Sequence, residues 1–344
     1  MDTALSPQDR GGASQPLLLA DGLRKHFPVG GGLLGRGRKV VRAVDDLSLS
    51  VTKSETLGVV GESGCGKSTV ARLLIRLIRP DRGTMVLDGD PVDEPHGITV
   101  NELRRQVQMV FQDSYASLNP RLTIGETLAF APKAHGVPAN EARERVRDLL
   151  AKVGLDPQSY ADRYPHELSG GQRQRVNIAR ALALRPRLVI LDEAVSALDK
   201  SVEAQVLNML VDLKTELGLT YIFISHDLNV VQYLSDRVLV MYLGKIVELG
   251  PVDAIYGSPQ HPYTLALLSA RPSMDPRRRT REAPIQGDPP NPIDPPSGCR
   301  FRTRCPFAEE VCARVEPVLA ETGRQAVACH MRVAGSGHSL AGRA

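Results

Sequence analysis

The chain has 344 residues, of which 42% are hydrophobic and 24% charged, proportions that predict a globular protein with a sizeable core and exclude a short peptide scaffold. Its 43 Lys and Arg against 39 Asp and Glu leave a net charge of only +4, which describes a mildly basic protein and not a polyanion binder. Aromatic residues make up 4% of the chain and Trp is absent, so a base-stacking surface is disfavoured and we expect no nucleic acid among its partners.

The beginning of the chain is polar. Residues 1–16 are rich in Asp, Ser, Gly, Gln and Pro without periodicity, and they predict a disordered tail. They also lack the hydrophobic stretch of a signal peptide. No apolar run in the chain approaches the roughly 20 residues that a membrane-spanning helix needs. We therefore expect a cytoplasmic protein that reaches a membrane only by binding a partner there.

Short apolar runs alternate with helical patterns from residue 17 to about residue 262. Buried strands are predicted at residues 56–60, 188–191, 221–225 and 238–242. Apolar residues recur at helical spacing in two intervening segments, at Val70, Leu73, Leu74 and Leu77 and at Val206, Leu210, Leu213 and Leu217. This order is typical of an α/β fold with a largely parallel sheet.

The stretch at residues 113–185 differs, because helical patterns prevail there without strong strands. One of its helices is predicted to begin at Asn140 as N-cap and to end at Gly154. The apolar face of that helix comprises Val146, Leu149, Leu150 and Val153. We interpret this stretch as a helical subdomain inserted into the α/β core.

The C-terminal part of the chain has a different composition. Eight prolines fall between residues 271 and 300, where a basic cluster also occurs at Arg277, Arg278, Arg279 and Arg281. That composition predicts a linker or an extended arm. We therefore predict a main domain at residues 17–262, a C-terminal extension at residues 263–334 and a disordered tail at residues 335–344.

Four of the five cysteines lie in the extension, at Cys299, Cys305, Cys312 and Cys329. A cytosolic setting argues against disulfides, so a metal centre becomes an alternative. The spacing C-x5-C-x6-C-x16-C is neither the paired C-x2-C of most zinc sites nor the common ferredoxin pattern. Four soft ligands suit Zn²⁺ or an iron–sulfur cluster, and unligated thiols remain a third reading.

A phosphate-binding loop is the strongest motif in the chain. The segment G-E-S-G-C-G-K-S fits the pattern G-x-x-x-x-G-K-[ST], and it follows a predicted strand and opens a predicted helix. Its glycines let backbone N–H groups turn toward phosphates, Lys67 would reach the terminal phosphates, and the Ser68 hydroxyl would ligate Mg²⁺. The candidate ATP-binding residues here are Gly61, Glu62, Ser63, Gly64, Cys65, Gly66, Lys67, Ser68 and Thr69. Cys65 is expected to serve only as a small residue, although a reactive thiol there would make the protein sensitive to oxidants.

An apolar strand further along the chain ends in two acidic residues, Asp192 and Glu193. In such an arrangement Asp192 would hold Mg²⁺ while Glu193 would polarise an attacking water. Many strands end in acids, so this pattern is weak by itself. Beside a phosphate loop it predicts a nucleotide-hydrolysing site.

A third motif lies between the other two, at Leu168, Ser169, Gly170, Gly171 and Gln172. Read locally, Ser169 is an N-cap and the glycines form a turn. The letters are also the LSGGQ signature of ATP-binding cassette proteins, and the chain resembles that family in the order of its motifs. Further motifs of the family match at Gln112 in the glutamine loop, at Ser196, Ala197, Leu198 and Asp199 in the D-loop, and at His226 after a strand. The resemblance implies a P-loop NTPase with a RecA-like core, an antiparallel β subdomain and an inserted helical subdomain.

The resemblance also implies roles for single residues. Glu193 would act as base or water-orienting residue, His226 would contact the γ-phosphate, and Gln112 would sense the metal and report to a transmembrane partner. Phe27 matches the aromatic that stacks on adenine, with His26 as the neighbouring candidate. In this family Ser169 and its glycines serve the nucleotide of a second subunit across a head-to-tail dimer.

Four further segments narrow the resemblance, at residues 117–120, 163–167, 241–244 and 261–264. They are similar to the ATPases of oligopeptide and dipeptide importers, including nickel-transporting relatives, over about residues 17–332. The long segment after Phe27 and the cysteine-bearing tail are similar to the second ATPase of such importers, the dipeptide-type "F" subunit. Some importers carry a 4Fe-4S cluster in this tail, which favours a cluster over Zn²⁺. Ala194 departs from the family, which usually has Pro there, and we expect a small backbone effect.

The sequence thus predicts an ATP-hydrolysing subunit of a binding-protein-dependent importer of di- or oligopeptides. Its expected partners are a homologous ATPase or a second copy of itself, two membrane permeases and an external solute-binding protein, at the cytoplasmic face of the plasma membrane. The same machine carrying nickel or another solute is one alternative. A soluble cassette ATPase not coupled to transport is another, and it is disfavoured because such proteins generally carry two cassettes or a long coiled-coil insertion. A non-hydrolysing regulatory cassette is also disfavoured, because Lys67, Asp192, Glu193 and His226 are all present.

Overall fold

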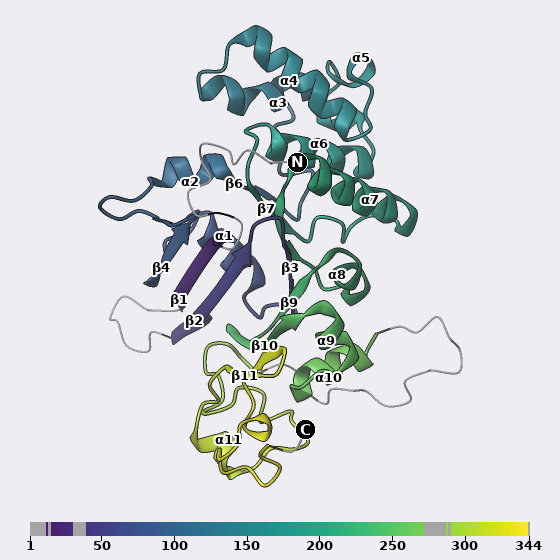
Figure 1. Ribbon diagram of the computed structural model, residues 1–344. Coiled ribbons are helices and arrows are strands. Elements are labelled where there is room, and N and C mark those ends of the chain that lie inside the picture. The colour runs from purple at the N-terminus through teal and green to yellow at the C-terminus, as the bar shows by residue number, and fades with distance from the viewer. Residues whose placement is uncertain (1–11, 13–14, 30–38, 272–286, 288–289, 343–344) are drawn as a thin grey trace. The chain divides into compact units, whose positions relative to one another are not determined.

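The computed structural model describes residues 12, 15–29, 39–271, 287 and 290–342 (Figure 1). The chain divides into two compact units, each built from separate stretches of sequence. Unit 1 takes residues up to Leu18, Val51–Thr56 and Val86–Ser225, and unit 2 takes Leu19–Ser50, Leu57–Met85 and residues from His226 onward. Most of the predicted N-terminal tail and the basic cluster at residues 277–281 lie outside the described residues.

Unit 1 contains three parallel strands in the order β6-β7-β8: β6 (Val107–Val110), β7 (Leu188–Asp192) and β8 (Thr220–Ile224). Every residue of β7 and β8 is buried, which agrees with the continuous apolar runs in the sequence. Val110 pairs with Leu191, and Asp192 pairs with Ile224. The carboxyl ends of the three strands therefore meet at one edge, where the loops after them come together.

The rest of unit 1 is mainly helical. Its helices are α2 (Val100–Gln106), α3 (Ile124–Ala134), α4 (Ala139–Lys152), α5 (Pro157–Tyr160), α6 (Gly170–Leu182) and α7 (Lys200–Leu217), with a 3-10 helix η1 at Pro165–Glu167. Helices α3, α4 and α5 lie beside one another within the stretch predicted to form the helical subdomain (Figure 1).

Helix α4 shows how far periodicity predicts such an element. Val146, Leu149 and Leu150 are buried as expected. The predicted N-cap at Asn140 is wrong, because Pro138 holds that position and Asn140 lies in the first turn. Pro is suited to a helix start because its missing N–H would have no partner there.

Unit 2 contributes most residues of the long strands β1 (Pro16–Val29) and β2 (Lys39–Thr52), which lie with β4 (Arg82–Leu87) in the order β2-β1-β4. The end of β4 pairs antiparallel with the short β5 (Asp90–Pro91). The strands β1 and β2 have 14 residues each. Their alternating burial shows that one face of each strand is covered and the other is more exposed to solvent.

A second set of strands in unit 2 has the order β11-β12-β10-β9-β3, comprising β3 (Thr56–Val60), β9 (Arg237–Tyr242), β10 (Lys245–Pro251), β11 (Ala320–Thr322) and β12 (Gln325–Val327). β3 and β9 are parallel, whereas β10 pairs antiparallel with β9 and with β12. The C-terminal extension is therefore joined to the main domain by a β ladder, in which Leu249 pairs with Ala326.

The helices of unit 2 are α1 (Lys67–Leu74), α8 (Leu228–Leu234), α9 (Val252–Gly257), α10 (Pro262–Ser269) and α11 (Glu310–Arg314), with a 3-10 helix η3 at His330–Arg332. Val70, Leu73 and Leu74 are buried as predicted, whereas Leu77 lies beyond the end of α1 and is exposed. At the end of the chain, where a disordered tail was predicted from residue 335, the structure describes residues through 342. His338 is buried there and its Nε2 lies 2.9 Å from the carbonyl oxygen of Phe307.

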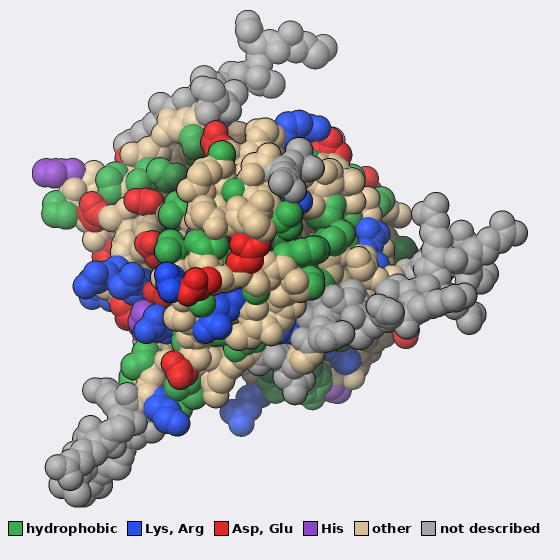
Figure 2. Space-filling view, turned by 90° about the horizontal axis from the view of Figure 1, so that it is seen from below, with side chains coloured by type: hydrophobic (Ala, Val, Ile, Leu, Met, Phe, Trp, Pro, Cys, Tyr) green, Lys and Arg blue, Asp and Glu red, His purple; other side chains and the backbone are tan. Residues whose placement is uncertain are grey.

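No helix among the described residues is long and apolar enough to cross a bilayer. Figure 2 shows Lys and Arg side chains interspersed with Asp and Glu side chains on the face seen from below. Such mixing of signs is consistent with the small net charge of +4.

Candidate functional site

The phosphate loop of unit 2 connects the end of β3 to the start of α1. Gly61 and Gly66 have φ of +151° and +110°, values that side-chain-bearing residues rarely adopt. A Cβ at Gly61 would lie 2.3 Å from the carbonyl oxygen of Met241, and one at Gly66 would lie 2.2 Å from that of Ala43. Only glycine fits at these two positions, because the backbone is packed against neighbouring strands there.

Lys67 extends across this loop. Its Nζ donates hydrogen bonds to the carbonyl oxygens of Gly61 at 2.7 Å and Glu62 at 3.0 Å. The side chain is buried, and nothing lies within 4 Å of a Cβ built on Gly64. An ammonium group, a helix N-terminus and an open loop backbone thus occur together, so these residues fit the triphosphate of ATP.

Cys65 points into the packed side of the same loop. Burial raises the pKa of its thiol, although the ammonium of Lys67 acts in the opposite direction. A buried, protonated thiol is a poor nucleophile. The geometry agrees with the interpretation of Cys65 as a small packing residue.

Two predicted site residues meet in unit 1, at the edge where β6 and β7 end. The Nε2 of Gln112 donates a hydrogen bond of 2.8 Å to Oε2 of Glu193. Glu193 has φ of +48°, and its N–H donates to the carbonyl of Ile224 at the end of β8. A residue with a side chain is strained in this conformation, and such strain is concentrated at functional positions. The backbone therefore fixes the direction of the Glu193 carboxylate.

The neighbours of Glu193 differ in their exposure. Asp192, the last residue of β7, is buried. Ala194 is also buried, whereas Ser196 and Ala197 of the D-loop are exposed. Asp199 is the N-cap of α7. Exposure of the D-loop leaves it accessible to another molecule.

The signature segment forms the start of α6. Ser169 caps the helix: its Oγ accepts from the N–H of Gln172 at 3.3 Å, and Oε1 of Gln172 accepts from the N–H of Ser169 at 2.9 Å. A Cβ at Gly171 would lie 2.4 Å from the side chain of Val202, while Gly170 has open space around it. The local reading of Ser169 as an N-cap is therefore confirmed, whereas Gly170 and Gly171 form the first turn of α6 and not a separate turn. The N-terminus of this helix is exposed.

The candidate adenine-binding residues lie near the end of β1. Phe27 is half-buried, and Nζ of Lys25 lies 5.6 Å from the centre of its ring. Nε2 of the His26 ring lies 3.1 Å from Oδ1 of Asp45, and the backbone N–H of His26 donates to Asp81 at 2.7 Å. Because Asp45 and Asp81 hold the ring and the backbone of His26, Phe27 is the better candidate for stacking. His226 lies exposed after β8, just before α8.

The four tail cysteines influence one another but do not form a ligand set. Burial raises the pKa of Cys299 to about 12 and that of Cys305 to about 11, with smaller contributions from the neighbouring thiols. Within the described part of the chain, no group of three or more His, Cys, Asp or Glu is placed to hold a metal ion. The prediction of an iron–sulfur cluster is therefore not supported.

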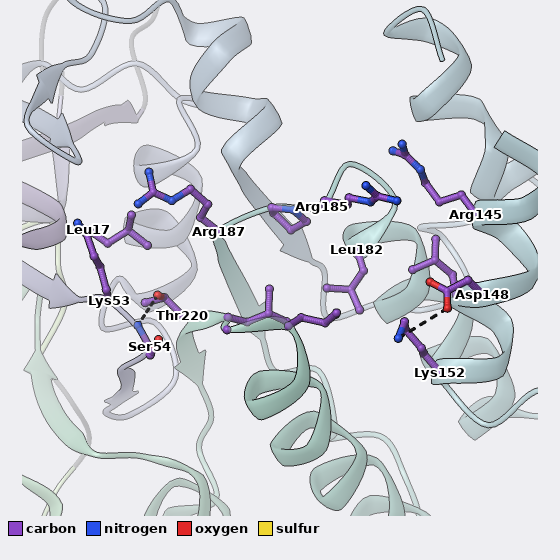
Figure 3. A pocket seen from close by; sticks show the side chains of 15 residues that line it. Leu17, Lys53, Ser54, Arg145, Asp148, Lys152, Leu182, Arg185, Arg187 and Thr220 are labelled. Atoms are coloured by element: carbon purple, nitrogen blue, oxygen red, sulfur yellow. Dashed lines mark hydrogen bonds and ion pairs between the residues drawn. The ribbon is translucent and has the colours of Figure 1, made fainter. Parts of the chain in front are cut away.

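A cavity of about 460 Å³ opens elsewhere in unit 1 (Figure 3). Basic side chains line it, and several are neutralised locally: Lys53 and Arg187 both pair with Asp88, at 2.9 Å and 2.8 Å. Lys152 likewise pairs with Asp148 at 3.6 Å. The predicted site residues lie elsewhere, and we assign this cavity no role.

The sequence analysis missed two residues that touch the phosphate loop. Arg304 of the extension forms an ion pair with Glu62, at 2.8 Å, and the Tyr263 hydroxyl accepts from the N–H of Glu62, also at 2.8 Å. Tyr263 lies in the segment at residues 261–264, which is similar to the importer ATPases, but no local pattern marks Arg304.

Two family models match the chain. Residues 44–196 match the model for "ABC transporter", and residues 247–312 match "Oligopeptide/dipeptide transporter, C-terminal region". The first match spans the phosphate loop, Gln112, the signature segment and Glu193. The second begins in β10 and includes Tyr263 and Arg304.

Curated relatives match over most of their length. The chain is 52% identical over 324 residues to the probable peptide ABC transporter ATP-binding protein y4tS of Sinorhizobium fredii, covering 93% of this chain and 91% of the relative. It is 50% identical to the oligopeptide transport ATP-binding protein OppF of Salmonella typhimurium, covering 91% and 95%. It is 48% identical to the dipeptide transport ATP-binding protein DppF of Escherichia coli, covering 92% and 94%.

Solved structures match at lower identity. CbiO1 of Clostridium perfringens, part of the ABC transporter complex cbiONQ, has a TM-score of 0.60 at 27% identity, covering 71% of this chain and 91% of its own. The ATP-binding cassette MJ0796, in a post-hydrolysis state bound to ADP and Pi, has a TM-score of 0.59 at 26% identity, covering 68% and 98%. The α/β fold predicted from the sequence is thereby confirmed.

Proposed function

The chain belongs to the ABC transporter family of ATP-binding proteins, in the branch with the oligopeptide/dipeptide transporter C-terminal region, and we propose that it energises a binding-protein-dependent importer of di- or oligopeptides. Its activity is hydrolysis of ATP to ADP and phosphate. The observation that carries the proposal is the phosphate loop, where Lys67 lies across a backbone that admits only glycine at Gly61 and Gly66. The peptide cargo is supported by relatives named for peptide, oligopeptide and dipeptide transport.

We propose the following roles for the residues of this chain. Lys67 binds the terminal phosphates through its ammonium, and the loop N–H groups bind their oxygens. Ser68, Gln112 and Asp192 hold Mg²⁺, which when bound neutralises charge on the phosphates. Glu193 orients and deprotonates the attacking water, and His226 contacts the γ-phosphate. Phe27 stacks on the adenine.

Gln112 has a second role in this proposal. Its amide already contacts the Glu193 carboxylate at 2.8 Å. A shift of Gln112 therefore changes the position or hydrogen bonding of the water-orienting carboxylate. This contact gives a physical route from the glutamine loop to hydrolysis.

The signature segment acts on the nucleotide of a partner subunit in this proposal. The N-terminus of α6 is exposed at Ser169 and Gly170, so it can receive a γ-phosphate from outside the chain. The partner is a homologous ATPase or a second copy of this chain. Two permeases and an external solute-binding protein complete the complex, which places the chain at the cytoplasmic face of the membrane.

The four tail cysteines take no part in the proposed function. Iron and zinc analysis of anaerobically purified protein distinguishes a cluster, a zinc site and free thiols.

The proposal is tested by assembling the chain with its partner ATPase and two permeases in lipid nanodiscs. We expect phosphate release to rise when a peptide-loaded solute-binding protein is added. If only a nickel-loaded binding protein stimulated phosphate release, the cargo would be nickel and not a peptide. Hydrolysis that is independent of permeases and binding protein would favour a cassette ATPase not coupled to transport.

A further inference from the structure

Arg304 of the C-terminal extension contacts the phosphate loop by an ion pair with the side chain of Glu62. Its two terminal nitrogens donate to the two carboxylate oxygens, at 2.8 Å to Oε2 and 3.0 Å to Oε1. The Arg304 side chain is only 6% exposed and that of Glu62 is 23% exposed. A two-point pair of this kind, largely withdrawn from water, fixes geometry as well as charge.

A second contact holds the backbone of the same residue. The hydroxyl of Tyr263 in α10 accepts the N–H of Glu62 at 2.8 Å. Tyr263 is fully buried, and its ring centre lies 4.6 Å from that of Tyr242 and 5.4 Å from that of Phe301. Glu62 is thus held at its side chain by the extension and at its backbone by α10.

The turn that carries Arg304 is anchored beside the loop. The Arg304 N–H donates to the carbonyl of Phe301, at 3.0 Å. The neighbouring Arg300 donates to the carbonyl of Leu243 and to the carboxylate of Asp45. Burial alone would raise the pKa of Asp45, but the charge and hydrogen bond of Arg300, together with Lys245 and His26, outweigh burial and lower that pKa. These anchors restrict the position from which Arg304 reaches Glu62.

The charge of Glu62 matters because of its place in the loop. The Glu62 carbonyl accepts from Nζ of Lys67 at 3.0 Å, so this residue adjoins the group that binds phosphate. An unpaired carboxylate beside a phosphate site repels the anionic ligand. Arg304 removes that penalty. Burial alone would lower the pKa of its guanidinium, but its hydrogen bonds and charge interactions with Glu62 and Tyr242 together hold that pKa above its usual range.

We propose that Arg304 is a positioning residue of the nucleotide site: it neutralises Glu62 and, together with Tyr263, holds the phosphate loop in its binding conformation. The C-terminal extension thereby contributes to ATP affinity. This inference rests on the proposed binding of ATP by the loop. It goes beyond that function because it assigns part of the nucleotide site to a region outside the ABC transporter match, which ends at residue 196.

The test measures binding of a fluorescent ATP analogue with Mg²⁺ to the full-length chain. Arg304→Gln is expected to weaken binding about tenfold, because it leaves the Glu62 carboxylate unpaired beside the phosphates. The double variant Arg304→Gln with Glu62→Gln is expected to recover to within about threefold of the wild type, since both charges are then absent. Recovery distinguishes charge compensation from a general loss of tail stability.

Two matched controls accompany these variants. Arg314→Gln removes another arginine of the extension whose pair with Glu310 is exposed, at 71% and 74%, and it should leave affinity unchanged. Tyr263→Phe should weaken binding about threefold by deleting one hydrogen bond to the loop. Tyr256→Phe deletes a comparable bond to the carbonyl of Leu228 and should have no effect on affinity. The tyrosine pair keeps the proposal testable if Arg304→Gln does not fold.

Unchanged affinity in both Arg304→Gln and Tyr263→Phe would overturn the proposal. So would an Arg304→Gln defect that Glu62→Gln does not repair, because Arg304 would then act only by stabilising the extension. Failure of the wild-type chain to bind the analogue would instead contradict the proposed function itself. The two failures are therefore distinguishable in one set of titrations.

Discussion

The side-chain amide of Gln112 lies 2.8 Å from the carboxylate of Glu193 and donates a hydrogen bond to it. The two residues are 81 positions apart in the chain. They meet because β6 and β7 are parallel and in register, with Val110 opposite Leu191, so both strands end at the same edge. The contact connects the glutamine loop to the residue that we assign to water activation.

Glu193→Gln is expected to lower steady ATP hydrolysis by at least about a hundredfold, because the proposed base is lost. The substitution keeps an oxygen that can accept from Gln112, so ATP binding should remain. Phosphate release in the assembled complex, with ATP binding measured alongside, checks both statements. Wild-type turnover by this variant would remove Glu193 from its role.

Lys67→Ala is expected to weaken ATP binding by about tenfold or more, since charged hydrogen bonds to the phosphates are lost. Titration of the full-length chain with a fluorescent ATP analogue measures the change. Lys152→Ala is a matched control, because Lys152 lies on α4 and pairs with Asp148. Equal affinity of the Lys67 and Lys152 variants would argue against the proposed phosphate contact.

Ser169→Arg is expected to suppress hydrolysis in the complex while ATP affinity of the isolated chain stays unchanged, because the signature serves the partner's nucleotide. The substitution also removes an N-cap, which costs about 1 kcal/mol of stability. Thr123→Arg controls for that cost, since Thr123 forms the same kind of capping box on α3. If Ser169→Arg weakens ATP binding in the isolated chain, the head-to-tail arrangement is contradicted.

The stability of the chain is expected to fall in acid because of His261. Burial holds its pKa down to about 3 from the ordinary 6.5, so it stays neutral in the folded state and protonates on unfolding. Between about pH 6.5 and 3 the unfolded state therefore binds more protons than the folded state. As the pH falls through that window, this one group lowers the free energy of unfolding by about 1.4 kcal/mol per pH unit. Above pH 6.5 His261 causes no such loss of stability.

His261→Asn tests this assignment. The Nδ1 of His261 accepts from the N–H of Tyr263 at 3.0 Å as cap of α10, and an asparagine oxygen can accept the same bond. Urea denaturation at several pH values should show a smaller slope below pH 6.5 in the variant. An unchanged slope would show that other groups cause the acid sensitivity.

Local sequence patterns predicted the elements that hold the site. Residues 56–60 form β3 as predicted, and Lys67 opens α1. Ser169 caps α6 as its position suggested. The start of α4 was misplaced by two residues at its cap, because Pro138 and Asn140 are both acceptable near a helix start. The tail cysteines show where a sequence pattern fails to predict a site, because four cysteines near one another in sequence need not converge on one metal ion.

The sequence by itself determined the chemistry of the chain: the phosphate loop, the acidic pair and the signature are each contiguous, and a short pattern suffices to identify them. Only the tertiary structure decided which distant groups meet them. Arg304 lies 242 positions from Glu62, and nothing local to either residue encodes their ion pair. The pair exists because β12 joins the extension to β10, and Arg300 and Phe301 then anchor the turn beside the loop. Register, burial and the packing of three aromatic rings set that geometry, and these are properties of the folded chain.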